Sequence, residues 1–334
     1  MTALTVVGGG IIGLSIAWRC VRRGLRVTVY DDGGDNGAWF AAAGMLAPAG
    51  ETSFGQEALT GLLTESARRW PGFAAELGDD IGYDRSGALD VALTSDDLAE
   101  ARRMWAYSER PEPLTASELR EREPALSPRV RGGAFRPGDH QVDPRRTVAA
   151  LRAALGDAVV AKRVSTIPDG PTVIAAGTGT AALTGLPVRP VKGLVLRLRG
   201  EPGLLRHVIN GYVDGRHVYV VPRADGEVVV GATQEERADT TVAAGAVLEL
   251  LRSATDLVPE LAELELTETV VRHRPGTPDN APLLGHWKDD VIVAAGHHRN
   301  GVLLAPVTAD LIADLVRTGR PDPLLAAFTP GRFT

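Results

Sequence analysis

Short apolar runs alternate with amphipathic segments in the first part of the chain, a pattern typical of parallel strands covered by helices. Residues 4–7 and 27–30 predict two buried parallel strands, and residues 12–23 predict the helix between them, with Gly24 at its C-terminus. Residues 56–70 also have a helical pattern. The chain therefore opens with a β-α-β unit followed by a further helix.

Two later apolar runs, 172–177 and 291–296, each end in glycine and predict further strands of the same sheet. An apolar helix is expected from about residue 301 to residue 316. The stretch 110–140 is rich in proline, glycine and charge, and we interpret it as excursions at a domain border. Within it, Thr115 and Glu118 form a capping-box pattern before Leu119.

The pattern changes between those two runs. Residues 193–199, 217–223 and 227–232 alternate apolar and polar positions or are rich in β-branched residues. The tripeptide at 224–226 joins the last two runs as a hairpin. An antiparallel sheet is therefore predicted as an insertion in an α/β domain.

Composition and charge exclude several classes of function. The chain has 334 residues, of which 44% are hydrophobic, and this suits a two-domain globular protein. The net charge is −6, and arginine pairs such as Arg145-Arg146 are interpreted as solvated helix faces, so nucleic acid and membrane partners are not expected. Cys20 is the only cysteine, and no apolar run could span a bilayer, so we expect a cytoplasmic protein.

A glycine turn follows the first predicted strand. Gly8 allows a tight turn, Gly10 lets the backbone approach a pyrophosphate, and Gly13 lets the helix pack close to the strand. The helix N-terminus would bind the pyrophosphate, and Asp31 at the end of the second strand would accept hydrogen bonds from ribose hydroxyls. The motif predicts an adenine dinucleotide without saying which one.

A run of small residues, Ala41-Ala42-Ala43-Gly44, followed by Met45, has two interpretations. It is either the start of an alanine-rich helix or a backbone surface that lies against a flat ligand. Small side chains permit both structures.

Two C-terminal blocks decide between these interpretations when they are taken with the glycine turn. They are Arg274-Pro275-Gly276-Thr277-Pro278-Asp279-Asn280 and Gly296-His297-His298-Arg299-Asn300-Gly301. With the alanine segment, they closely resemble the FAD-dependent glycine oxidases of the D-amino-acid oxidase superfamily, over nearly the whole chain.

The resemblance implies an α/β fold with a glutathione-reductase-type FAD-binding domain and an inserted antiparallel-sheet substrate domain. The FAD-binding domain would comprise residues 1–84, 141–188 and 270–334, and the substrate domain residues 85–140 and 189–269. Related sarcosine oxidases hold flavin through a cysteine in the substrate half of the chain. Because Cys20 lies on the first helix, FAD should be bound noncovalently here.

The resemblance also implies the site residues. The expected cofactor-binding residues are Gly8, Gly10, Ile11, Ile12, Gly13, Asp31, Ala41, Ala42, Ala43, Gly44, Met45, Val164, Ala176, Gly177, His298, Arg299, Asn300, Gly301, Val302 and Leu303. The expected substrate-binding residues are Arg274, Arg299, Tyr219, His217 and Gly50.

Arginine suits this role because its planar fork holds a carboxylate at two points. Arg274 is interpreted as the carboxylate ligand, whereas Arg299 either binds substrate or stabilises the turn before the last helix. Tyr219 lies in an apolar strand, where core packing is the alternative to a substrate contact. His217 should face the same side of that strand as Tyr219.

The implied reaction is oxidation of glycine, or of an amine with a carboxymethyl group, by hydride transfer to flavin. Molecular oxygen would reoxidise the flavin, and the products would be glyoxylate, an amine and hydrogen peroxide. The pathway, thiamin synthesis or a specialised metabolism, stays open, as does a homo-oligomer. The alternatives are a flavin dehydrogenase that uses an electron carrier and a dinucleotide-binding module without turnover.

The chain departs from the family pattern around the expected substrate gate. His298 stands where relatives often have an aromatic residue, and Ala49 where relatives can have histidine. Trp39-Phe40 replaces the small or hydroxyl residues that usually precede the alanines. Since two of these changes make the gate smaller in side-chain volume or more polar, we expect a pocket that admits an N-substituted glycine.

Overall fold

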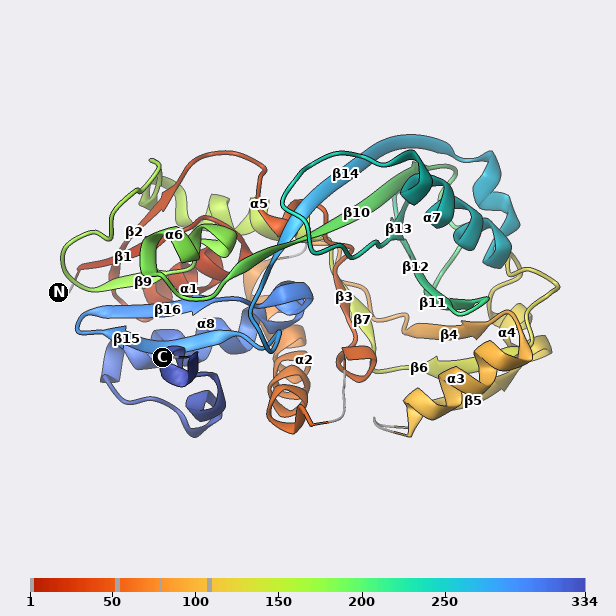
Figure 1. Cartoon of the computed structure of the whole chain (residues 1–334), viewed down its shortest axis with the longest axis horizontal. Helices are drawn as coiled ribbons and strands as arrows, with labels where there is room; N and C mark the ends of the chain where they lie inside the picture. Colours follow the sequence, from red (N-terminus) through yellow and green to blue (C-terminus); the bar gives the residue numbers. More distant parts are fainter. Residues whose placement is uncertain (1–2, 52–54, 79, 107–109, 334) are drawn as a thin grey trace.

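The computed structural model describes residues 3–51, 55–78, 80–106 and 110–333. Two large β-sheets lie next to each other along the long axis of the molecule, and helices cover both (Figure 1). No helix within the described residues is long and apolar enough to cross a membrane.

The first sheet has six strands in the order β15-β16-β9-β1-β2-β8. Five strands are parallel and β15 joins the edge in the antiparallel direction, so the predicted early and late strands do share one sheet. The strands are β1 (Ala3–Val7), β2 (Arg26–Asp31), β8 (Val159–Ala161), β9 (Thr172–Ile174), β15 (Leu283–Lys288) and β16 (Val291–Ala295).

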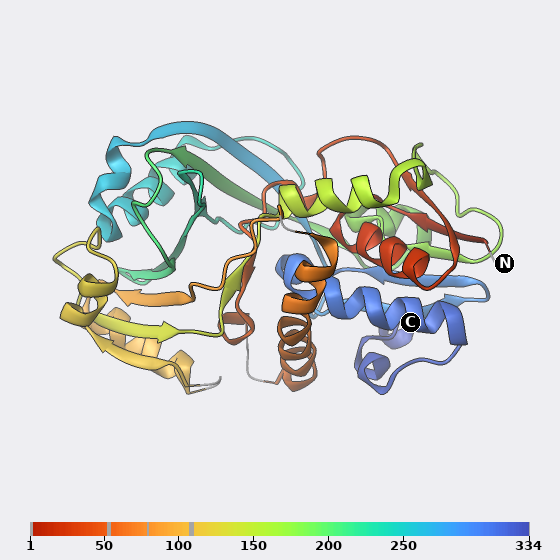
Figure 2. The same cartoon turned by 180° about the vertical axis from the view of Figure 1, so that it is seen from behind.

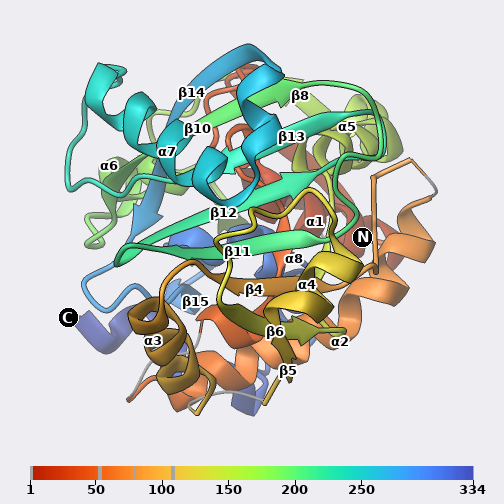
Figure 3. The ribbon, with the colours of Figure 1, turned by 90° about the vertical axis from the view of Figure 1, so that its right-hand side faces the viewer.

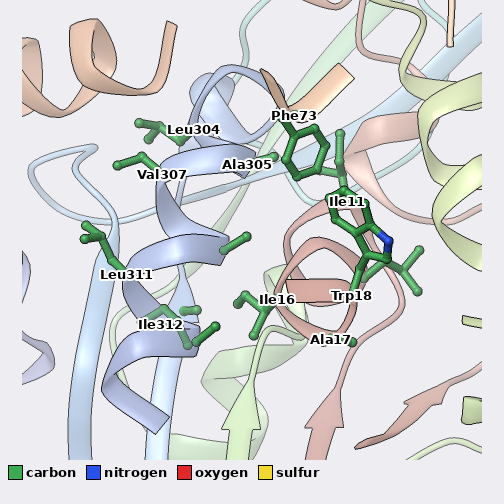
Figure 4. Packing of buried hydrophobic residues seen from close by; sticks show 14 of the residues in the cluster. Ile11, Ile16, Ala17, Trp18, Phe73, Leu304, Ala305, Val307, Leu311 and Ile312 are labelled. Atoms are coloured by element: carbon green, nitrogen blue, oxygen red, sulfur yellow. The ribbon is translucent and has the colours of Figure 1, made fainter. Parts of the chain in front are cut away.

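Helices α1, α5 and α8 form a layer on one face of this sheet, and α2 packs against α8 (Figure 2). Ile16 of α1, Ile312 of α8 and Phe73 of α2 belong to one apolar cluster (Figure 4). The helices of this half are α1 (Ile11–Arg22), α2 (Glu57–Leu77), α5 (Pro144–Leu155), α6 (Thr180–Thr184) and α8 (Gly301–Thr318).

Pro306 interrupts the backbone hydrogen bonds of α8, because proline has no N–H group to donate. Two side chains of α2 form hydrogen bonds with the backbone on either side of this proline. Ser66 Oγ donates to the carbonyl of Leu303 at 2.6 Å and accepts from the Val307 N–H at 3.3 Å, and Trp70 Nε1 donates to the Leu303 carbonyl at 3.0 Å. Helix α2 therefore fixes the first turn of α8.

The second sheet has eight strands in the order β14-β10-β13-β12-β11-β4-β6-β5 (Figure 3). Its neighbouring strands are antiparallel except β11 and β4, which are parallel, so the predicted antiparallel sheet and its hairpin are confirmed. The strands are β4 (Ala88–Ala92), β5 (Glu112–Thr115), β6 (Gly132–Arg136), β10 (Arg189–Arg199), β11 (Val208–Val213), β12 (Arg216–Pro222), β13 (Glu227–Gly231) and β14 (Glu265–Gly276).

Helices cover both faces of the second sheet. Helix α7 packs on the face that carries Val218 and Val220, and α3 packs on the opposite face against Ala134 and Tyr212. The helices are α3 (Ser95–Trp105), α4 (Ala116–Arg122) and α7 (Ala244–Leu257), and a small sheet pairs β3 (Met45–Leu46) with β7 (His140–Gln141).

The stretch 110–140, which we interpreted as excursions at a domain border, contains the regular elements β5, α4 and β6. Thr115 and Glu118 form a capping box that begins α4. A Cβ at Gly133 would lie 1.8 Å from the Asp90 carbonyl oxygen, so glycine is what lets β6 approach β4. The glycines that suggested a loop thus serve strand pairing.

Strand β14 was not predicted from the sequence pattern. It pairs with β10 along its whole length, and the two strands reach from the second sheet toward the first (Figure 1). The domain boundary expected at residue 270 therefore lies within one continuous strand. This strand carries Arg274 to the border of the two halves.

Candidate active site

A cavity of about 1000 Å³ takes its walls from both sheets and from the first turns of α1 and α8. It brings together all of the expected site residues except Gly13, which packs behind the wall. Those that line it are Gly8, Gly10, Ile11, Ile12, Asp31, Ala41, Ala42, Ala43, Gly44, Met45, Gly50, Val164, Ala176, Gly177, His217, Tyr219, Arg274, His298, Arg299, Asn300, Gly301, Val302 and Leu303.

The glycine turn forms one end of the cavity. Gly8 has a φ of +114°, and a Cβ there would lie 2.3 Å from the Ala175 carbonyl oxygen. A Cβ at Gly13 would lie 1.9 Å from the Gly8 carbonyl oxygen, so only glycine lets α1 approach β1 this closely. Gly10 begins α1 without a side-chain cap, which leaves the first N–H groups of the helix for an anionic ligand.

Asp31 lies beside this turn at the end of β2. Arg152 Nη2 donates to its Oδ2 at 3.1 Å, and its Oδ1 has no hydrogen-bond partner within the described part of the chain. A Cβ at Gly9 would lie 2.5 Å from the Asp31 carboxylate, so Gly9 is a cavity residue that the sequence analysis missed. The run of three glycines was the signal for it.

The alanine segment is not the start of a helix. One 3-10 turn at Ala38–Phe40 leads into extended chain at Met45–Leu46, and Gly44 has a φ of +79°. Arg145 Nε donates to the Phe40 carbonyl at 2.8 Å, and Arg223 donates to the Ala43 carbonyl. The alanine segment therefore presents backbone to the cavity, and hydrogen bonds from Arg145 and Arg223 to its carbonyl groups hold it in place.

This contact corrects the interpretation of Arg145 as part of a solvated helix face. Its guanidinium also donates to Glu268 Oε2 at 2.9 Å and lies over the Phe40 ring. Residues far apart in the sequence form this network, so no local pattern could have indicated it.

Arg274 lies on the opposite wall of the cavity. Its Nη1 donates to the Thr233 carbonyl at 3.1 Å, and its guanidinium covers Gly193, where a Cβ would lie 2.5 Å from Nη1. Burial lowers the pKa of Arg274, and among the described residues no carboxylate lies within 4.0 Å of it. The guanidinium therefore has unused donors in the cavity.

Tyr219 lies next to Arg274 and points across the sheet. Its hydroxyl lies over Gly231 of the neighbouring strand, where a Cβ would be 2.3 Å away, so Gly231 makes room for it. Burial raises the pKa of Tyr219, so the hydroxyl is neutral and can donate or accept. The side chain lines the cavity while its strand neighbours Val218 and Val220 form the core.

The other expected substrate residues lie nearer the rim. Arg299 is half exposed and forms an ion pair with Glu51, which follows Gly50 in a short turn. His217 is exposed and its Nε2 lies 3.1 Å from Glu100 Oε1. Arg299 thus already has a carboxylate partner, in contrast to Arg274.

His298 occupies a left-handed conformation, with a φ of +50°, just before α8. It is buried, and its Nε2 has no hydrogen-bond partner among the described residues. Burial lowers its pKa to about 4, and the charges of Arg274 and Arg299 act in the same direction. The imidazole is therefore neutral near pH 7.

The sequence profile of a family described as FAD dependent oxidoreductase matches residues 3–315. The chain belongs to this family. The glycine oxidase of Geobacillus kaustophilus is 34% identical over 354 residues, which cover 94% of this chain and 92% of the relative. A crystal structure of glycine oxidase from that organism matches with a TM-score of 0.90 and 32% identity, over 99% of both chains.

Two further relatives have different names. The bifunctional protein ThiO/ThiG of Synechocystis sp. is 34% identical over 98% of this chain and 53% of the relative, so the chain spans about half the length of that protein. The structure of iminodiacetate oxidase from Chelativorans sp. BNC1 matches with a TM-score of 0.85 and 26% identity, over 98% of both chains. The predicted family and fold class are thus confirmed.

FAD is the cofactor of this family, and the cavity of this FAD-dependent oxidoreductase fits it. The glycine turn and the uncapped start of α1 leave room and N–H donors for a pyrophosphate, and Asp31 Oδ1 is available to a ribose. Helix α8 also begins at the cavity without a side-chain cap. No group of three or more metal-binding side chains occurs among the described residues.

Proposed function

We propose that the protein oxidises glycine or an N-substituted glycine, with oxygen as the electron acceptor. The amine and its α-carbon would lose a hydride and a proton, and water would hydrolyse the imine to glyoxylate and an amine. Oxygen would take up the two electrons and leave as hydrogen peroxide. The observation that carries this proposal is Arg274, a guanidinium on the cavity wall without a carboxylate partner among the described residues.

Arg274 would bind the carboxylate of the substrate through two parallel hydrogen bonds. Its hydrogen bond to the Thr233 carbonyl and its contact with Gly193 fix the plane of the guanidinium before substrate arrives. The Tyr219 hydroxyl would donate to the same carboxylate. These contacts orient the α-carbon, and such positioning contributes much of the rate enhancement in reactions of this kind.

FAD supplies the hydride acceptor. Negative charge that develops near α8 would be stabilised by the N-terminus of this helix, whose first residues line the cavity. The amine must be deprotonated before oxidation, and the charges of Arg274 and Arg299 disfavour an ammonium near them. The neutral His298 adds no positive or negative charge.

The names of the relatives support the proposed substrates. Glycine oxidase indicates free glycine, and iminodiacetate oxidase indicates a glycine that carries a second substituent on nitrogen. The two small or polar residues at the gate, Ala49 and His298, both line or adjoin the cavity and favour the larger class.

The test is turnover by the purified flavoprotein in air with glycine, sarcosine and a longer N-carboxymethyl amine. We expect glyoxylate and hydrogen peroxide in equal amounts. If none of the three amines reduces the flavin, the proposal is wrong. Flavin reduction without peroxide would instead identify an electron carrier as the acceptor, and a strong preference for glycine would contradict the enlarged pocket.

A further inference from the structure

The cavity continues past Tyr219 across the second sheet. Tyr219 pairs directly with Asn210 of β11, and Asn210 pairs directly with Asp90 of β4. All three line the cavity, together with Tyr212, which lies two residues beyond Asn210 on the same face. This row of polar side chains is not explained by binding of a carboxymethyl group at Arg274.

Asp90 organises the far end of the row. Its Oδ2 accepts from Arg136 Nε at 2.9 Å and from Trp105 Nε1 at 2.7 Å, and its Oδ1 accepts from Asn210 Nδ2 at 3.2 Å. Asp90 and Arg136 are both buried, so their charges compensate each other in the wall of the cavity. The end of the cavity is therefore polar but has no net charge from this pair.

Two polar atoms remain available there. Asn210 Oδ1 and the Tyr212 hydroxyl make no hydrogen bond with any described residue, although both side chains are partly buried. The Asp90 carboxylate fixes the Asn210 amide so that its oxygen acts as an acceptor. Both side chains line the cavity, so these two atoms can bond water in the free protein and a ligand group that takes the place of that water.

Helix α3 closes this end of the cavity. Met104 lines the cavity, and Trp105 holds Asp90 from the same helix. The His217 ring lies 4.6 Å from the Tyr212 ring at an angle of 67°, at the edge of the opening. We call the space bounded by Asn210, Tyr212 and Met104 the distal pocket.

We propose that the distal pocket binds a neutral hydrogen-bonding group, an amide or a hydroxyl, at the end of the substituent on the substrate nitrogen. This inference rests on the proposed function, because Arg274 must hold the carboxymethyl end. A second carboxylate is disfavoured, since Arg136, the buried cation that the described residues place in the wall of this pocket, is already paired with Asp90.

The length of the substituent follows from the sheet. The Tyr219 hydroxyl lies over Gly231 of β13, and Asn210 lies on β11, two strands away. Strands are ~4.8 Å apart, so the separation is ~10 Å. With bonds of ~1.5 Å and angles of ~111°, each bond of an extended chain advances ~1.25 Å, so an arm of about eight bonds covers this distance. Sarcosine is too short to reach the distal pocket.

The experiment uses the purified flavoprotein and thioether analogues, in which sulfur replaces the amine so that they bind without reacting. Methylthioacetate is the short analogue, and three long analogues carry an eight-bond arm that ends in an amide, a carboxylate or an isopropyl group. Dissociation constants come from the change in flavin absorbance. We expect the amide to bind about tenfold tighter than the isopropyl group, as two neutral hydrogen bonds would give.

Asn210→Leu and Tyr212→Phe should each lower the preference for the amide over the isopropyl analogue by at least threefold. The dissociation constant of methylthioacetate should stay within twofold of the parent value in both variants. Thr267→Val is the control, since it removes a side-chain hydrogen bond from the same sheet away from the cavity. Equal binding of the amide and isopropyl analogues, tighter binding of the carboxylate, or an unchanged preference in both variants would overturn the inference alone. Failure of methylthioacetate to bind, with no flavin reduction by glycine or sarcosine, would instead overturn the proposed function.

Discussion

Replacing Arg274 by glutamine removes the charge that we assign to the substrate carboxylate and leaves the cavity otherwise intact. Two opposite charges ~4 Å apart attract by ~4 kcal/mol at the effective dielectric constant of a protein surface. Truncating one partner of a shielded charge pair costs ~2–5 kcal/mol. A loss of ~3 kcal/mol lowers kcat/KM by roughly 100-fold. Arg274→Lys keeps the positive charge but cannot form two parallel hydrogen bonds to a carboxylate, so we expect kcat/KM to fall about tenfold.

The same substitution should not destabilise the protein. Arg274 is shielded from water and has no carboxylate partner among the described residues, so its charge stabilises no folded contact except the hydrogen bond to Thr233. An uncompensated shielded charge opposes folding. The free energy of unfolding of Arg274→Gln should therefore lie within ~1 kcal/mol of the parent value.

The assay is peroxide production with glycine and sarcosine, together with urea unfolding of each variant. Arg199→Gln is the matched control, because Arg199 lies on the same sheet but is exposed and bonds the Asp225 carbonyl. Its kcat/KM should not change. The reasoning is refuted if Arg274→Gln keeps more than a third of kcat/KM, or if it loses activity only because it unfolds.

Four other outcomes follow from the structure. Ser66→Ala should lower the free energy of unfolding by ~1–3 kcal/mol in urea titrations, because the Leu303 carbonyl loses one of two donors and the Val307 N–H loses its acceptor; an unchanged midpoint would contradict this. Gly44→Ala should lower the flavin-to-protein absorbance ratio, because φ is +79° and its Cβ would meet backbone; full flavin content would count against it. Because burial lowers the pKa of His298 to about 4 on folding, the unfolded chain binds the proton first, so stability should drop as pH falls from about 6.5 to 4; His298→Phe should reduce that slope and leave the part due to the buried His297, whose pKa is lowered to about 3, and an equal slope would refute the assignment. Acid precipitation should release FAD, since Cys20 is buried and its pKa is raised to about 12; flavin in the pellet would show a covalent link.

The sequence predicted those parts of the fold that depend on residues close to one another along the chain. The turn between β1 and α1 needs glycine at positions 8 and 13, because a Cβ at either position would clash with nearby backbone. The spacing of the glycines in the sequence indicated this. The capping box of Thr115 and Glu118 likewise begins α4 where its pattern says. Strand β14 was not predicted, because charged residues interrupt its apolar pattern and one extra residue of β14 shifts its register with β10 between Arg197 and Leu198.

The candidate site likewise combines local motifs, which the sequence reveals, with contacts between distant residues, which it does not. Arg274, singled out by its motif, lines the cavity, but the ion pair of Arg299 with Glu51 joins residues 248 positions apart and has no local signal. The pair of Asp90 and Arg136 was missed for the same reason, because two adjacent strands bring it together. Contacts of this kind depend on the register of the sheet, which the hydrophobic pattern alone leaves open.

The most direct measurement is a crystal structure of the flavoprotein with methylthioacetate. The account predicts both carboxylate oxygens at ~2.7–3.2 Å from the guanidinium nitrogens of Arg274, with the Tyr219 hydroxyl on one of them. A carboxylate bound to Arg299 instead, or one placed away from Arg274, would contradict it.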